Sequence, residues 1–363
     1  MLPSGILTAM TLCYYVTGHG YGHAIRTAQV LKALPTDLPL VIKTTVPQQL
    51  FREELHNRRF DYYYAEYDSG CIQPDSVTIL KRETLDRFAA INAENRKQLD
   101  SEIQFLVDHH IRLVASDVPP FPLTAARVAG IPAVATTNFT WCDIYNDYVE
   151  TEADRALIDD MARQYGAASL ALISDLHLPT TTSVFPHVEH VPLTVRKGVS
   201  RRGEVDRWLD NDLRLGLLYL GTWGLDIDWA AVESLDDWLF LSYEPTPCKV
   251  RNVATVSRQE WMYEDIVASV DAMICKVGYG AVTDCIGNST PMVHLPRRDF
   301  VEYSALVAGM DRWGGRVELS QSDFIAGYWK PALDAALKVK MRTDVFRTDG
   351  AQVIAARLLE LLD

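Results

Sequence analysis

The sequence predicts an α/β protein made of two doubly wound, Rossmann-like domains that face a central cleft. First, its 363 residues are more than one compact core usually supports. Second, short apolar runs alternate with helix-length segments, which is typical of a parallel sheet covered on both faces. Third, this alternation breaks once, from about residue 178 to 212, and then begins again. We therefore expect domains at residues 1–195 and 196–345.

The individual elements follow from the apolar runs. In the first domain we expect strands at Leu12–Thr17, Leu40–Thr44, Asp61–Tyr64, Leu113–Ser116, Ala133–Thr136 and Ala171–Ser174. In the second, strands are expected in "LRLGLLYLGTWG", "DDWLFLS", "VDAMICKVGYG" and "PMVHLP". The stretch 178–212, rich in Pro, Thr and charged residues, is the expected linker. Residues 346–363 have helical apolar spacing and predict a packing helix, with a crossing back to the first domain left open.

Composition excludes several classes of protein. The formal net charge of −13 opposes binding to nucleic acid or to an anionic membrane surface. No stretch reaches the about 18 consecutive apolar residues of a transmembrane helix, and no secretion signal is evident. The six cysteines contain no CxxC pair, which fits a reducing compartment. We expect a cytoplasmic protein without a nucleic-acid partner.

Glycine turns follow three of the predicted strands. The first, "TGHGYGHAIR", contains Gly18 and Gly20 but has His23 where a dinucleotide fingerprint needs its third glycine. The second follows a strand at Gly221, and the third holds Gly278 and Gly280. Glycine before a helix lets a phosphate approach the free N–H groups of the helix start. The alternative is that these glycines only shape tight turns. Two such turns in one domain, one of them after Lys276, favour phosphate binding.

A histidine and a carboxylate stand at two strand ends in the first domain. His19 ends the first strand, and Asp117 follows "IRLVAS". Because the carboxyl ends of parallel strands share one edge, Asp117 could orient His19 as a general base. The alternatives are a loop hydrogen bond for His19 and a helix cap for Asp117. His23 is expected in the first helical turn, as a structural or ligand-binding group.

Residues that contact an acceptor are expected after another strand of the first domain. The segment "TNFTW" offers Asn138 and Trp141 at a strand end, and we group His23 with them on the acceptor side. The alternative is a capped helix with Trp141 buried. For metals, His109 and His110 are adjacent and point to different sides, and "DID" at 226–228 lies where Asp is commonplace. We expect neither a metal nor a resident cofactor.

The second half resembles the GT-B superfamily of nucleotide-sugar-dependent glycosyltransferases. "CKVGYGAVTDCIGNSTPMVHLPRRDF" is similar to its donor-binding signature. The resemblance implies that Gly278 and Gly280 contact the donor phosphate, Asp284 the ribose, and Asp299 or Glu302 the transferred sugar. It also implies a basic histidine in the first glycine loop, supported by an Asp, which His19 and Asp117 match in position.

A more extensive resemblance is to the N-terminal, glycosyltransferase-like region of plant L-arabinokinases. "YVTGHGYGHAIR", "SDVPP", "TTNFTWCDIYNDYV", "VPLTVR", "KVGYGAVTDC", "RRDFVEY" and "GYWKPALDAAL" occur in the same order over nearly the whole chain. The glycine-serine-rich ATP loop of a sugar kinase domain is missing from the sequence, so kinase activity is not implied.

These observations predict a metal-independent, inverting glycosyltransferase that uses a UDP- or other NDP-sugar and an unidentified acceptor hydroxyl. The catalytic residues would be His19 and Asp117. The donor site would comprise Gly18, Gly20, Gly221, Thr222, Lys276, Gly278, Tyr279, Gly280, Asp284, Arg297, Arg298, Asp299 and Glu302. Two alternatives stay open: a nucleotide-sugar epimerase or hydrolase on the same fold, and a non-catalytic sugar-nucleotide-binding protein.

Overall fold

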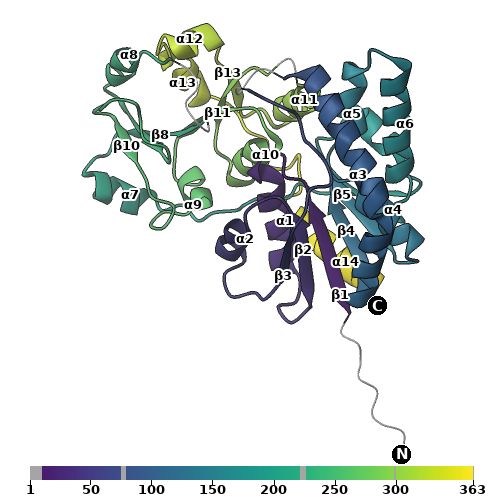
Figure 1. Ribbon diagram of the computed structural model, residues 1–363. Helices are drawn as coiled ribbons and strands as arrows, with labels where there is room; N and C mark the ends of the chain where they lie inside the picture. Colours follow the sequence, from purple (N-terminus) through teal and green to yellow (C-terminus); the bar gives the residue numbers. More distant parts are fainter. Residues whose placement is uncertain (1–9, 75–78, 221–225, 298–299, 363) are drawn as a thin grey trace, which may run out of the picture. The chain divides into compact units, whose positions relative to one another are not determined.

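The chain forms two compact units, each built on its own parallel sheet (Figure 1). This is a computed structural model, and it describes residues 10–74, 79–220, 226–297 and 300–362. The first unit contains the described residues up to 194 together with those from 349 onward, and the second contains 195–348. The predicted fold class, two Rossmann-like parallel-sheet domains, is confirmed.

The first unit has a parallel sheet with the strand order β3-β2-β1-β4-β5-β6-β7. Every residue of β1, β2, β4 to β6 is buried except Arg112, because helices cover both faces of the sheet. The strands span β1 Thr11–Val16, β2 Leu40–Thr44, β3 Asp61–Tyr64, β4 Ile111–Asp117, β5 Ala133–Thr137, β6 Leu170–Ser174 and β7 Val188–Val191.

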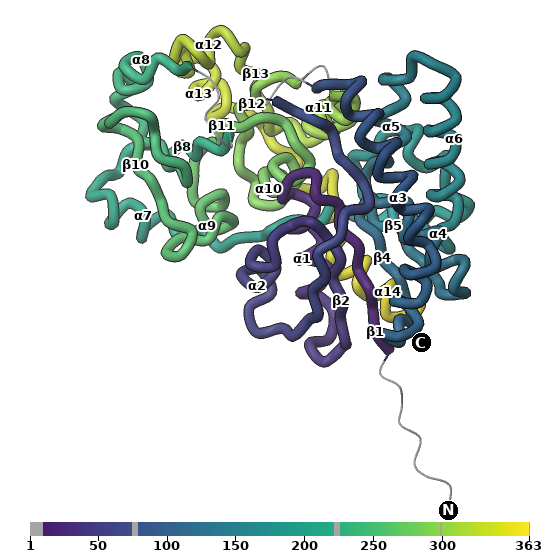
Figure 2. The backbone as a smooth tube through the Cα atoms, viewed as in Figure 1, coloured from purple at the N-terminus to yellow at the C-terminus, as the bar shows by residue number. Residues whose placement is uncertain are grey.

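The helices of the first unit lie in two layers. One layer consists of α1 (Tyr21–Ala33), α2 (Gln48–Leu55) and the last helix, α14 (Gly350–Leu362), around a core that includes Leu31, Phe51 and Leu358. Figure 2 shows α14, in yellow, close to the strands of this unit. The other layer holds α3 (Lys81–Asp108), α4 (Phe121–Val128) and α6 (Glu152–Tyr165). Shorter helices are α5 (Trp141–Tyr145), η1 (Asn146–Tyr148) and η2 (Pro179–Val184).

The second unit has a parallel sheet with the order β10-β9-β8-β11-β12-β13. One face packs on a core of large aromatic side chains, among them Trp238, Phe240, Phe324 and Trp329. Its strands are β8 Arg214–Tyr219, β9 Trp238–Ser242, β10 Val253–Thr255, β11 Ala272–Lys276, β12 Met292–Leu295 and β13 Arg316–Glu318. Its helices are α7 Arg202–Leu209, α8 Trp229–Glu233, α9 Tyr263–Val267, α10 Tyr279–Asn288, α11 Tyr303–Trp313, α12 Gln321–Ile325 and α13 Lys330–Ala336.

The predicted linker at 178–212 is wrong in part. It contains strand β7, which pairs in parallel with β6, and helix α7. The six strands expected in the first domain all form, with ends within two residues of the prediction. No helix in the described part of the chain has the length and apolar character needed to cross a bilayer.

His294 is a buried histidine in β12 that makes the second unit sensitive to acid. Burial, aided by the charge of Arg316, lowers the pKa of His294 to about 4. The unfolded chain, with a histidine pKa of about 6.5, binds the proton first as the pH falls. Stability is therefore complete above pH 6.5 and declines toward pH 4. We expect a loss of about 2 kcal/mol between pH 7 and pH 5, measured by urea unfolding. In His294→Leu this part of the loss should vanish; an unchanged loss would contradict the assignment.

Candidate functional site

In the first unit, the candidate site lies where the strand order reverses. Strands β1 and β4 are neighbours, and Val16 pairs with Asp117 at their carboxyl ends. The chain leaves β1 through the loop 17–20 and enters α1, which begins at Tyr21. Gly20, at the N-cap, has φ of 72°, a conformation that favours glycine. Ligands of doubly wound sheets bind at this kind of position.

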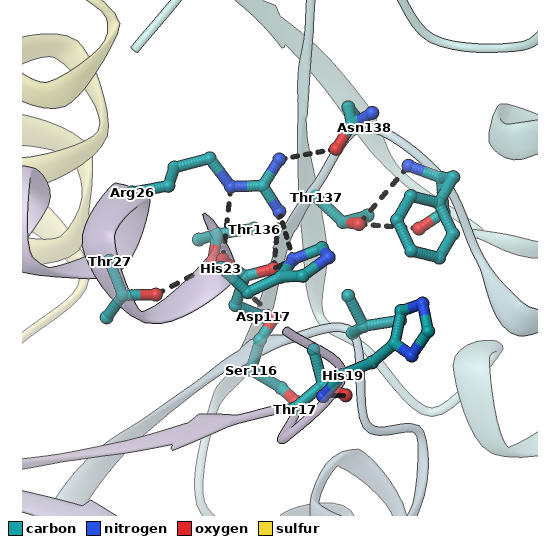
Figure 3. A network of polar contacts seen from close by, with 12 residues as sticks. Thr17, His19, His23, Arg26, Thr27, Ser116, Asp117, Thr136, Thr137 and Asn138 are labelled. Carbon is teal, nitrogen blue, oxygen red and sulfur yellow. Dashed lines mark hydrogen bonds and ion pairs between the residues drawn. The ribbon is translucent and has the colours of Figure 1, made fainter. Parts of the chain in front are cut away.

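Asp117 is the centre of a buried network of hydrogen bonds and charges (Figure 3). Its side chain is 2% exposed, and His23 Nδ1 lies 3.0 Å from its Oδ1. Arg26 contacts both carboxylate oxygens, with Nε donating to Oδ2 at 3.1 Å. Thr27 Oγ1 donates to the same Oδ2 at 3.1 Å. Burial would raise the pKa of Asp117, but the charges of Arg26 and His23 outweigh it and hold the pKa below its ordinary value. The carboxylate is ionised.

The expected pairing of Asp117 with His19 is wrong, because the imidazole held by Asp117 belongs to His23. His23, Arg26 and Thr27 occupy positions i, i+3 and i+4 of α1, so they share the helix face that points to the end of β4. His19 precedes the helix. Figure 3 shows its ring turned away from the Asp117 carboxylate.

His19 is instead held by the segment at residues 70–71. The backbone N–H of Cys71 donates to His19 Nδ1 at 3.2 Å, which leaves the proton of a neutral ring on Nε2. A Cβ on Gly70 would lie 2.4 Å from the same nitrogen, and Gly70 has φ of 60°. The ring also meets Trp141 edge-on, with 5.4 Å between ring centroids. His19 is therefore arranged as a hydrogen-bond donor through Nε2.

The two remaining acceptor-side residues are fully buried. Asn138, at 0% exposure, accepts a hydrogen bond from Arg26 through Oδ1. Trp141, also at 0%, follows Thr140, which caps α5 in a capping box. This matches the alternative of a capped helix with Trp141 buried. Neither side chain can touch an acceptor in this arrangement.

Asp68 is a residue of this site that sequence reasoning missed. It accepts hydrogen bonds from Thr17 Oγ1 at 2.9 Å and from Trp141 Nε1 at 2.7 Å. Burial raises the pKa of Asp68 to about 6, although these two hydrogen bonds oppose the shift. Asp68 stands four residues beyond β3, in "EYDSGC", and nothing in that pattern indicates which strand end it reaches.

In the second unit, the two glycines at the start of α10 are not crowded by any described atom. Gly278 is the N-cap residue after β11 and, as a glycine, has no side chain that could cap the helix. A Cβ on Gly278 or Gly280 would meet none of the described atoms within 4 Å, and neither glycine has positive φ. Packing within the described protein therefore does not require glycine at either position. Close approach of a ligand to the backbone would require it.

Two cations stand next to this helix start. Lys276, the last residue of β11, is half-buried and has no ion-pair partner within the part of the chain that the structure describes. Burial lowers the pKa of Lys276, and the nearby charge of Arg297 lowers it further. Arg297 Nη1 donates to the carbonyl of Val277 at 3.2 Å. The site thus concentrates positive charge at a helix N-terminus.

The expected contact of Asp284 with a ribose is contradicted by its burial. Asp284 is 2% exposed and lies on the core side of α10. Its Oδ1 accepts from the backbone N–H of Arg196 at 3.0 Å, and its Oδ2 accepts from Arg196 Nε at 3.0 Å and Nη2 at 2.5 Å. Arg196 also lies over the ring of Tyr263, 4.0 Å from the centroid. Asp284 therefore anchors the beginning of the second unit to α10.

The other predicted donor residues have different outcomes. Gly18 is exposed and packs so closely that a Cβ would lie 1.9 Å from Thr45 Oγ1. Tyr279 is half-buried in the first turn of α10, and Glu302 is buried just before α11. Their donor contacts stay predictions. Gly221, Thr222, Arg298 and Asp299 lie outside the described residues. In the described residues, no group of three or more His, Cys, Asp or Glu side chains could hold a metal ion.

Most of the chain is similar in sequence to a known plant protein. No family model matches the chain. It is 28% identical over 343 residues to the L-arabinokinase of Arabidopsis thaliana. The match covers 91% of this chain and 32% of that protein, so the chain spans about a third of the length of its curated relative.

Solved structures of glycosyltransferases match nearly the whole chain. The calicheamicin glycosyltransferase CalG4 has a TM-score of 0.61 at 15% identity, covering 97% of this chain and 94% of that one. UGT2 of Phytolacca americana, solved with UDP-2-fluoro-glucose and pterostilbene, has a TM-score of 0.60 at 15% identity and the same coverages. MurG of Acinetobacter baumannii has a TM-score of 0.58 at 16% identity, covering 97% and 99%. The fold of this chain is therefore the GT-B fold of these glycosyltransferases.

Proposed function

We propose that the protein is a glycosyltransferase that transfers a sugar from a nucleoside diphosphate to an acceptor hydroxyl. The observation that carries this proposal is the start of α10, where two glycines leave the backbone open beside Lys276 and Arg297. A diphosphate would accept hydrogen bonds from the N–H groups at the start of α10 and from the two cationic side chains. The UDP and UDP-sugar complexes of the structural neighbours support a uridine nucleotide as the first donor to test.

In this proposal the leaving group is stabilised without a metal. As the bond between the anomeric carbon and the diphosphate breaks, its electron pair goes to the phosphate oxygen. Lys276, Arg297 and the dipole of α10 stabilise the charge that develops there. Fixed charges of this kind need no reorganisation during the reaction.

The proposed general base is His23. With its Nδ1–H donating to Asp117, Nε2 holds the lone pair that takes the proton of the acceptor hydroxyl. Arg26 Nη2 also lies 3.1 Å from Nδ1. In the proposed tautomer Nδ1 carries the proton and donates it in a hydrogen bond to the Asp117 carboxylate, and does not accept a hydrogen bond from Arg26. Asp117 then stabilises the imidazolium. Attack by the acceptor oxygen on the face opposite the diphosphate inverts the configuration of the anomeric carbon. In this proposal His19 is not the base but donates a hydrogen bond through Nε2.

Removal of the Lys276 charge tests the donor site. We expect Lys276→Ala to weaken the binding of UDP at least tenfold, because a charge-assisted contact to phosphate is lost. Isothermal titration calorimetry measures the Kd. Lys338→Ala is the matched control, because Lys338 is exposed beyond the end of α13 and should leave the Kd unchanged. Equal affinities for both variants would contradict the proposed site.

Turnover separates a transferase from its alternatives. UDP release from UDP-sugars should require an acceptor, which a panel of sugars, phenols and sugar acids would provide. Conversion of the UDP-sugar without an acceptor would indicate an epimerase or hydrolase. Binding without any turnover over the panel would indicate a sensor.

A further inference from the structure

A polar cavity lies at the edge of the first unit's sheet opposite to the candidate site. Its volume is about 620 Å³, and its walls come from the amino ends of β1, β2 and β3 together with α2 and the segment that follows α2. Thr11, the first residue of β1, lines this cavity. The candidate site at His23 and Asp117 lies instead beyond Val16, the last residue of β1. Six residues at about 3.3 Å each separate the two places by roughly 17–20 Å. A ligand in this cavity would be distinct from the substrates of the candidate active site.

The lining of the cavity is strongly basic. Arg52, Arg58, Arg59 and His56 line it, against one described carboxylate, that of Asp61. None of the three arginines forms an ion pair within the described ranges of the chain, whereas many other arginines of the protein do. The concentration of unpaired positive charge is unusual for a chain with a net charge of −13. Like charges that share a cavity repel each other, and an anion placed between them removes that cost.

Arg58 is built into the cavity wall. It is 9% exposed, and its Nη1 donates to the carbonyls of Leu31 and Leu34, each at 3.0 Å, near the end of α1. Its Nε–H is buried and has no hydrogen-bond partner among the described residues. Its Nη2 donates to the carbonyl of Leu38 at 3.4 Å, and burial lowers the pKa of Arg58 although the charge of Asp37 opposes the shift. A buried donor without a partner is costly and is usually satisfied by a ligand or water.

His109, which also lines the cavity, is already engaged. Its Nδ1 lies 2.9 Å from the carbonyl of Phe105, and its Nε2 lies 2.8 Å from the hydroxyl of Tyr63. Arg52, His56 and Arg59 are exposed in the cavity lining and available to a ligand, and the buried Arg58 forms part of the wall.

We propose that this cavity binds a small phosphorylated molecule, held by Arg52 and Arg59 with Arg58 at the wall. Arginine binds phosphate with two parallel hydrogen bonds, and three guanidinium groups match a diphosphate or a sugar phosphate better than a single inorganic ion. The volume of about 620 Å³ leaves room for an organic part beside the phosphate. Asp61 could accept hydrogen bonds from the hydroxyl groups of that part.

Calorimetric titration with inorganic pyrophosphate tests the proposal. The titration uses the Lys276→Ala variant, so that the phosphate site at α10 contributes little. We expect one saturable site, and at least tenfold weaker binding when Arg52→Gln and Arg59→Gln are added, because charge-assisted contacts are lost. The control adds Arg127→Gln and Arg207→Gln, which remove the same charge at exposed positions outside the cavity. Equal affinity in the two variants, or binding that does not saturate, would overturn the proposal.

Chemical modification of the unmutated chain gives a second, independent measurement. Phenylglyoxal reacts with exposed arginines, and mass spectrometry locates the products. Pyrophosphate should protect Arg52 and Arg59 but not Arg127; modification of all three at the same rate would contradict the site.

Repeating the titration with glucose 1-phosphate shows whether an organic part adds affinity. Since the readouts concern different arginines from those at α10, this site can fail while the proposed donor site holds, and the reverse.

Discussion

Replacement of His23 by asparagine is expected to lower kcat by about 100- to 10,000-fold, the usual contribution of a positioned general base. The reason is the 3.0 Å contact of His23 Nδ1 with Asp117, which orients the ring and stabilises its charged form after proton transfer. The proposed donor site belongs to the other unit, so the Kd for UDP should stay within about twofold of the original. Initial rates with saturating donor and acceptor measure kcat, and calorimetry measures the Kd.

His19→Asn is the matched control for this experiment. His19 lies in the same glycine loop, but its Nδ1 is occupied by the Cys71 N–H, so its loss should cost much less than that of His23. Asp117→Asn is a poorer test, because it would leave Arg26 buried without its carboxylate and lower stability as well. A variant His23→Asn with nearly full turnover, together with an inactive His19→Asn, would reverse the assignment.

Most of the fold could be predicted because its central strands are apolar on both faces. Runs such as Leu12 to Val16 and Ala272 to Cys275 are buried at every position, and this pattern is unlike that of a surface helix. Strands β7, β10 and β13 escaped prediction because they are three or four residues long and half-exposed. In "VEHV", the polar residues of β7 are those of an edge strand, where one face meets water.

The sequence predicted at which edge of the sheet the candidate site lies, but not which side chains contact each other there. The rule that parallel strands end together correctly brought Asp117 near the first glycine loop. His23 was correctly expected in the first turn of the helix, but the prediction did not consider that His23 and Arg26 share a helix face that points to Asp117. Arg26 itself was missed, since a buried arginine looks like a surface residue until its carboxylate is located.

The ion pair between Asp284 and Arg196 was also missed, because it forms only once the chain is folded. The resemblance implied a ribose contact for Asp284, but Asp284 lies in the middle of α10 and its side chain is buried. Arg196 lies in the stretch expected to be a linker, so no pattern indicated that it pairs with Asp284. The two residues are 88 positions apart in the sequence, and the fold of the second unit brings them into contact.

Breaking this buried pair is expected to destabilise the second unit strongly. Removing one partner, as in Arg196→Met or Asp284→Ala, leaves the other charge buried without compensation, which costs about 3–5 kcal/mol. Urea unfolding followed by tryptophan fluorescence measures the loss, since Trp238 and Trp329 lie in the core of that unit. Glu204→Ala is the control, because its contact with Arg201 is on the surface and should contribute little.

The double variant Arg196→Met with Asp284→Leu separates charge from packing. If the cost of each single change comes from an orphaned buried charge, removing both charges should recover most of the stability. If the double variant is as unstable as the sum of the two single variants, the pair contributes through packing and backbone anchoring. The hydrogen bond from the Arg196 backbone N–H to Asp284 would then be the contact that matters, since it ties the first residues of the unit to the helix whose start forms the proposed phosphate site.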